Sequence, residues 1–223
     1  MSVALTIIDQ PEPRAERLAR MDLDEATIVR ALELAIQDRK ACTHLDPPYF
    51  AGQTRTARTV RYLREGFIPR GWGYTDARNY SLLLHPTDLI AIAVATGNDA
   101  TGDAAQEDLR LAHGKGEMTS NAVTANAEQL SLFTGIAWES EMSGDDHVGH
   151  EGRITWLLVI NERGGRLHAE LALPRSFCDS NVTAWEERIV LPSIVIDDEP
   201  VENLIEERAT PLDVQGLVQR RKS

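Results

Sequence analysis

The segment from residue 153 to residue 173 constrains the fold more than any other part of the chain. It reads RITWLLVIN, ERGG and RLHAELAL: a nearly continuous apolar run, a turn sequence with two glycines, and an alternating run. Two such runs around a Gly-rich turn predict a β-hairpin, and a strand that is apolar on both sides is typical of the middle of a sheet. In the second run alternate residues from Leu167 to Leu173 are expected to face inward, with His168 and Glu170 outward.

A second hairpin is predicted from NYSLLL (79–84) and LIAIAVAT (89–96), which flank the turn sequence HPTD. In LIAIAVAT the branched residues Ile90, Ile92 and Val94 share one face and alanines occupy the other. The branched face is expected to pack in a core. The alanine face either lets another element approach closely or forms an edge-like surface of low relief.

Three amphipathic segments predict helices. They are residues 22–41, with Asp22 or Asp24 as N-cap, residues 55–67, with Thr54 or Thr56 as cap, and residues 119–133. Residues 1–20 fit either a short strand or the start of a helix, and WEERIVLPSIVI (185–196) fits a further strand. The fold class that follows is α+β, with helices packed on a mostly antiparallel sheet built from two β-hairpins.

The domain organisation predicted from this pattern is simple. Residues 1–196 form a single α+β domain, in which residues 1–21 are a candidate for a loosely attached N-terminal segment. Residues 197–223 form a tail that is first acidic and then basic, with partly helical character.

The polar connection at 97–118 contains Gly97 and Gly102, which have the spacing of a phosphate-binding loop. Such a loop requires a lysine after its last glycine, but here Asp103 follows and would repel a phosphate. A calcium-binding loop starting at Asn98 or Asp99 lacks the glutamate that its twelfth position requires. The default interpretation is the exit of a strand followed by a turn.

Charge is distributed unevenly along the chain, whose formal net charge is −12 at pH 7. Residues 51–70 carry five arginines against one glutamate, and four of those arginines recur every third residue: Arg55, Arg58, Arg61 and Arg64. One interpretation is a solvated helix face that the protein's own acids neutralise. The other is a contact with phosphates or with an acidic partner, since arginine pairs well with both.

Two segments are strongly acidic. Residues 139–151 hold five carboxylates and no lysine or arginine, and residues 197–207 hold six carboxylates. Within the first segment the candidate partner-binding residues are Glu139, Glu141, Asp145 and Asp146. Imidazole and carboxylate side chains at this density are also able to hold a divalent cation, the candidate ligands being His147, His150 and Asp145. The alternative is an ordinary solvated loop, and no other cofactor is expected.

No catalytic signature stands out, since the sequence contains neither GxSxG nor CxxC. Its two cysteines are too few for a disulfide framework. The N-terminus lacks the basic start of a signal peptide, and no apolar run approaches the roughly 18 residues of a membrane span. A cytoplasmic protein without membrane contact, and without catalytic activity, is therefore expected.

Two segments resemble uncharacterised proteins of bacterial plasmids, integrative elements and phages. They are RGWGYTDARNYSLLLHPTDLIAIAVATGNDATG and ELALPRSFCDSNVTAWEERIVLPSI. The resemblance covers about residues 52–196. It is carried by Gly71, Trp72, Asn79, the AIAVATGN run, the WEER of 185–188, Leu191 and Pro192. It implies an origin in mobile DNA and brings no catalytic residue with it.

The sequence thus favours a non-catalytic acidic interaction protein of a mobile genetic element. Its expected partner is a protein or nucleoprotein complex of a nucleic-acid-processing host machine, which it would inhibit in the manner of an anti-restriction or anti-CRISPR protein. Two alternatives stay open. One is a metal-dependent hydrolase with an Asp/His site at 145–150, and the other is a regulator that binds nucleic acid directly through the arginines at 55–64.

Overall fold

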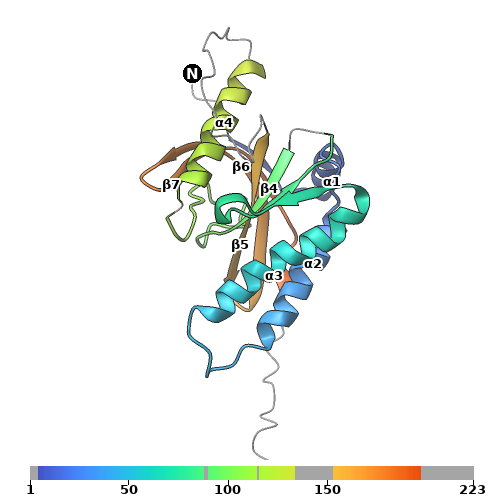
Figure 1. Cartoon of the computed structure of the whole chain (residues 1–223), viewed down its shortest axis with the longest axis vertical. Coiled ribbons are helices and arrows are strands. Elements are labelled where there is room, and N and C mark those ends of the chain that lie inside the picture. The colour runs from blue at the N-terminus through green and yellow to red at the C-terminus, as the bar shows by residue number, and fades with distance from the viewer. Residues whose placement is uncertain (1–4, 88–89, 115, 134–152, 197–223) are drawn as a thin grey trace, which may run out of the picture.

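The computed structural model describes residues 5–87, 90–114, 116–133 and 153–196 (Figure 1). Four α-helices lie in this part of the chain: α1 (Pro11–Ala19), α2 (Glu25–Lys40), α3 (Phe50–Phe67) and α4 (Glu117–Phe133). Two short 3₁₀ helices, η1 (Ile68–Arg70) and η2 (Ala77–Asn79), follow α3. The described strands are β1 (Thr6–Ile8), β2 (Gly73–Thr75), β3 (Leu82–Leu84), β4 (Ile90–Thr96), β5 (Ile154–Arg163), β6 (Arg166–Cys178), β7 (Asn181–Val190) and β8 (Ile194–Val195).

The strands form one mixed, mostly antiparallel sheet in the order β1-β7-β6-β5-β4-β3-β2, with β8 also paired to β6. The α+β class is thereby confirmed. The pairs β3–β4 and β5–β6 are antiparallel, and Gly164 and Gly165 turn the second with the positive φ angles that glycine favours. A sheet built from two hairpins is nevertheless not confirmed, because β7 adds another antiparallel neighbour and β4 runs parallel to β5.

Both faces of the sheet are covered, by different elements. On one face α1, α2 and α3 pack on a core that includes Ile92, Leu158 and Leu171. On the other face the alanines of β4 are buried in a cluster with Leu109 and Val123, which belong to the 97–111 segment and to α4. The close-approach interpretation of the alanine face is therefore confirmed.

The predicted helices are present with shifted ends. Asp24 caps α2, accepting a hydrogen bond from the Thr27 backbone N–H at 2.7 Å. The third helix begins at Phe50, five residues earlier than predicted, so the predicted cap residue Thr56 lies inside it and donates to the Gly52 carbonyl. Pro47 and Pro48 lie just before this helix, and the Pro47 carbonyl accepts the Phe50 N–H at 2.8 Å.

The ambiguous N-terminal residues form both of the elements that were considered, β1 and α1. Leu18 of α1 is buried in the core. Arg17 makes a bidentate ion pair with Glu187 of β7, with N–O distances of 2.7 and 2.9 Å. Apolar burial and an ion pair thus join α1 to the sheet.

Two glycines of α3 allow a test of how closely α2 and α3 pack. A Cβ at Gly66 would lie 2.6 Å from Cγ2 of Thr27, whose hydroxyl is bonded to Asp24, whereas a Cβ at Gly52 would meet nothing within 4 Å. Gly66→Ala is expected to lower the free energy of unfolding by about 1–3 kcal/mol. The control Gly52→Ala is expected to raise it by roughly 0.5–1 kcal/mol through helix propensity. Urea unfolding followed by circular dichroism measures both, and two changes of the same sign would contradict this packing.

Candidate interaction surface

The four arginines singled out in the sequence lie on α3, and each contacts a carboxylate of this chain. Arg55 is the most buried of them, and its Nη1 lies 2.7 Å from a carboxylate oxygen of Glu162 on β5. Burial lowers the pKa of the Arg55 guanidinium, and Glu162 opposes that shift. Glu162 also pairs with Arg39 of α2 at 2.7 Å. This triad fastens the helix layer to the β5–β6 hairpin and leaves little of Arg55 for a partner.

The other three arginines lie nearer to solvent. Arg58 pairs with Asp38 of α2 at 3.0 Å, Arg61 with Glu65 at 2.7 Å, and Arg64 with Asp76 at 2.7 Å. The side chains of Arg58 and Arg61 are 41% and 54% exposed, so their outer surfaces can be reached by another molecule. The geometry favours a row of positive charge that the protein largely balances itself.

Two hollows lie beside this row, on the side of α3 that faces solvent. The first has a volume of about 520 Å³ and lies between the end of α2 and the first half of α3. Its lining includes Asp38, Ala41, Cys42, Phe50, Ala57 and Arg58. The second, of about 530 Å³, is lined by Arg64, Ile68, Tyr74 and Asp76 among others. Arg61 lines both hollows, which therefore adjoin along α3; together we call them the α3 groove.

Apolar side chains are exposed at both ends of the α3 groove. Leu45 (77% exposed), Tyr49 and Phe50 lie at the α2–α3 connection, and Ile68 and Tyr74 lie at the far end. Exposed apolar clusters with a polar surround are typical of binding surfaces. This surface was not predicted from the sequence. The one sequence pattern that pointed to it was an aromatic pair next to two prolines, and such a pattern by itself indicates only a helix break.

The electrostatics at the first hollow depend on Asp38. It accepts a hydrogen bond from the Tyr62 hydroxyl at 2.8 Å and pairs with Arg58. The hydrogen bond to Asp38 raises the pKa of Tyr62 above its ordinary value. The groove therefore has apolar ends and a middle in which cationic groups are partly neutralised.

A second polar cluster joins Asp22, Trp72 and His85. The Nε2 atom of His85 lies 3.4 Å from Asp22, and its Nδ1 accepts the Thr87 backbone N–H at 3.2 Å. Trp72 donates to the same carboxylate at 3.3 Å, and its ring meets the imidazole edge-on with centroids 4.7 Å apart. Because both imidazole nitrogens face partners within the chain, the cluster is suited to holding the α1–α2 turn against β2 and β3. It is poorly suited to general-base chemistry.

The third cluster corrects a prediction. Glu170 was expected to face outward, but it is fully buried, and Arg188 of β7, also fully buried, binds it through Nε at 2.6 Å and Nη2 at 3.1 Å. The alternation was right about which face Glu170 takes. That face is covered by residues 97–111, so it does not meet solvent.

The 97–111 segment is fixed to this ion pair by backbone groups. Arg188 donates to the carbonyls of Ala100 and Asp103, at 3.1 and 3.3 Å, and to that of Gln106, while the Gly102 N–H donates to Glu170 at 3.0 Å. Gly102 has a φ of +70°, and a Cβ there would lie 3.0 Å from the Cβ of His168. Gly97 and Gly102 thus allow close packing in a turn that covers the sheet. This is consistent with the strand-exit interpretation.

The remaining candidates lie outside the described residues. These are the acidic residues Glu139, Glu141, Asp145 and Asp146 and the proposed metal ligands His147 and His150. Within the residues that the structure describes, no group of three or more His, Cys, Asp or Glu side chains is arranged to hold a metal ion. In the same part of the chain, no helix combines the length and the apolar character required to cross a bilayer.

Comparison with known proteins gives no relative to which this site can be matched. No protein-family model, curated protein or solved structure matches the chain. The resemblance to proteins of mobile genetic elements therefore stays a prediction from residues 52–196.

Proposed function

We propose that this chain is a non-catalytic interaction protein of a mobile genetic element that binds, and thereby inhibits, a basic nucleic-acid-processing protein of the host. The observation that carries the proposal is the internal pairing of the α3 arginines. Those positive charges are paired with carboxylates of the chain itself. The excess of negative charge that produces the net charge of −12 therefore lies in other parts of the sequence.

One uninterrupted part of that negative charge is the 139–151 segment, with five carboxylates and no lysine or arginine. A run of carboxylates presents charges of the same sign as a nucleic-acid backbone. A groove that normally captures phosphates would attract it over a distance set by the ionic strength. Occupying that groove would exclude the nucleic acid, which is how such a protein would inhibit its partner.

The same pairing weighs against the nucleic-acid-binding alternative. A phosphate approaching Arg58 or Arg64 would be repelled by the neighbouring carboxylates of Asp38 or Asp76 and by a strongly negative net charge. The metal-dependent hydrolase depends on residues 145–150, which lie outside the described residues, and it stays a prediction.

Neutralising four acids of the 139–151 segment tests the proposal. The variant E139Q/E141Q/D145N/D146N is expected to bind the host protein captured by the parent chain about 10–100-fold more weakly at low salt, because the attraction between opposite charges is lost. Duplex DNA or RNA is expected to displace the parent chain from that protein. Titration calorimetry with the purified partner measures both effects.

The matched control changes net charge by the same amount at four exposed acids elsewhere, as E12Q/E16Q/D99N/E107Q. It is expected to change affinity less than threefold, or about 0.6 kcal/mol. Equal weakening by both variants, or a captured protein that nucleic acid does not displace, would contradict the proposal. Direct binding of DNA by the chain, weakened by Arg58→Ala, would favour the nucleic-acid-binding alternative.

A further inference from the structure

The α3 groove has the features of a site for an amphipathic helix. Phe50, Thr54, Ala57, Arg61, Arg64 and Ile68 line it and follow one another at steps of four and three residues. Steps of this kind keep side chains on one side of a helix, where a second helix can pack along them. The stripe is apolar at its two ends and cationic in between.

Chemistry restricts the occupant to an acidic one. A guanidinium has five N–H donors and a carboxylate takes two in a bidentate pair, so the half-exposed Arg58 and Arg61 each have capacity for a second carboxylate. A second copy of α3 laid across the first would set arginines against arginines. The expected occupant is therefore a short helix with apolar side chains on one face and acids along its flank.

A segment of this chain has that pattern. After Pro200, apolar residues occur at Val201, Leu204 and Ile205, with Glu202 and Glu206 beside them. The spacing i, i+3, i+4 predicts an amphipathic helix, and a proline with preceding acids is typical of a helix N-terminus.

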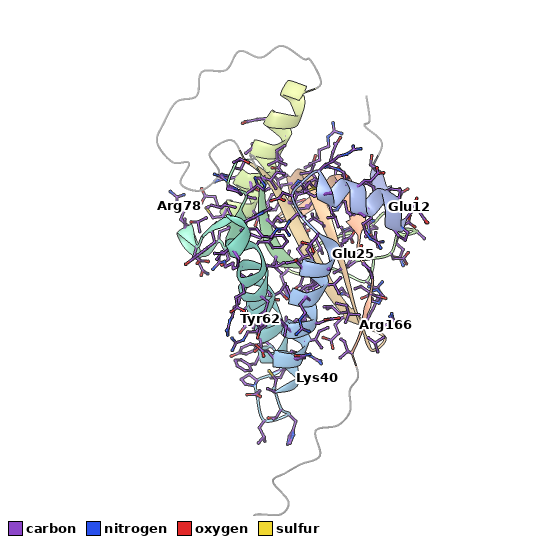
Figure 2. All side chains as sticks on the ribbon, turned by 90° about the vertical axis from the view of Figure 1, so that its right-hand side faces the viewer. Glu12, Glu25, Lys40, Tyr62, Arg78 and Arg166 are labelled. Carbon is purple, nitrogen blue, oxygen red and sulfur yellow. The ribbon has the colours of Figure 1, made fainter. Side chains whose placement is uncertain are left out.

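The described chain ends on the β5–β6 hairpin, which contacts the same two helices that line the first hollow. The Ile196 N–H donates to the Gly165 carbonyl in the β5–β6 turn, and Glu162 of the same hairpin contacts Arg39 and Arg55. Those two arginines are neighbours in sequence of Asp38 and Thr54, which line the first hollow. Figure 2 shows Lys40 at the end of α2 and Arg166 at the start of β6 at the same end of the molecule.

We propose that residues 197–209 of this chain occupy the α3 groove. Residues 197–200 give a reach of up to about 13 Å when extended between Ile196 and the apolar residues that follow. Leu204 and Ile205 then pack against the apolar lining of the first hollow, and Glu202 and Glu206 pair with the outer surfaces of Arg58 and Arg61. The proposal is independent of the proposed function, which concerns the acids at 139–146.

Cys42 reports on occupancy, because it lines the first hollow and is a free, half-buried thiol. In the full chain carrying C178S, the variant L204D/I205D is expected to react with an aromatic disulfide reagent about 5–10-fold faster at Cys42 than its parent, since reactivity follows the undocked fraction. Salt at 0.5 M is expected to accelerate the parent, because it screens the ion pairs. Adding a synthetic 197–209 peptide is expected to restore protection to the variant.

Two controls make the result specific. Leu217→Asp changes the same tail outside the proposed segment, and the exposed Cys178, measured in a C42S chain, reports on general changes in reactivity. Neither is expected to show the acceleration. Equal Cys42 rates in parent and L204D/I205D, equal acceleration by Leu217→Asp, or failure of the peptide to protect would overturn the proposal. So would protection that grows with protein concentration, which would place the tail on a neighbouring copy.

Discussion

Replacing Arg188 by methionine is expected to lower the free energy of unfolding by about 3–5 kcal/mol. The substitution leaves the Glu170 carboxylate in the interior without its cation, because neither side chain is exposed. It also removes donors from the carbonyls of Ala100 and Asp103. Urea unfolding followed by circular dichroism measures the change, and the 97–111 segment is expected to lose amide protection first.

The double variant E170M/R188M distinguishes the loss of the ion pair from the cost of leaving one charge buried without its partner. Removing both charges also removes the cost of taking them out of water, so the double variant is expected to lose less stability than the sum of the two single variants. It should still be less stable than the parent, because the Gly102 N–H and the carbonyls of the covering segment lose their partners.

Arg175 and Glu186 provide a matched control on the same two strands. They pair at 3.1 Å, but the two side chains are 35% and 26% exposed. Arg175→Met is therefore expected to cost less than about 1 kcal/mol. If Arg175→Met and Arg188→Met cost the same, burial would not be what makes the Glu170–Arg188 pair important.

The strands were predictable from sequence wherever a residue's immediate neighbours decide its environment. The apolar runs at β4 and β5 and the alternation at β6 located these strands and the faces of β4 and β6, although β6 continues beyond Leu173 to Cys178. The environment of Glu170 was not predictable, because alternation indicates the face of a residue and gives no information on what covers it. The cover comes from a polar segment about 70 residues earlier, whose composition indicates a loop.

The same reasoning applies to the interaction surface. The three-residue spacing of arginines placed them correctly on a helix. Three of them have partners on other parts of the chain, Asp38, Asp76 and Glu162, which meet the arginines only in the folded protein. The exposure of Leu45 and Phe50 likewise depends on tertiary packing, since an apolar side chain near a proline has no local signal for facing solvent.

Asn126 of α4 provides a second test of a buried polar contact with a covering element. It is fully buried. Its side-chain N–H groups donate to the carbonyls of Thr155 at 2.8 Å and Pro174 at 3.2 Å. Its side-chain oxygen accepts a hydrogen bond from the Thr155 backbone N–H at 2.7 Å. Pro174 lies where the pairing of β6 with β7 shifts register, and a proline has no N–H of its own. One side chain thus satisfies backbone groups of two strands at an irregular place in the sheet.

Asn126→Ala is expected to lower the free energy of unfolding by about 2–4 kcal/mol, because one N–H and two carbonyls lose their partners in the interior. Asn126→Asp retains the acceptor and loses both donors while burying a charge, so it should be no more stable than the alanine variant. Asn121→Ala is the control on the same helix, at an exposed position, and should change stability by no more than about 0.5 kcal/mol. A cost below 1 kcal/mol for Asn126→Ala would mean that apolar contacts such as that of Val123 suffice to hold α4 on the sheet.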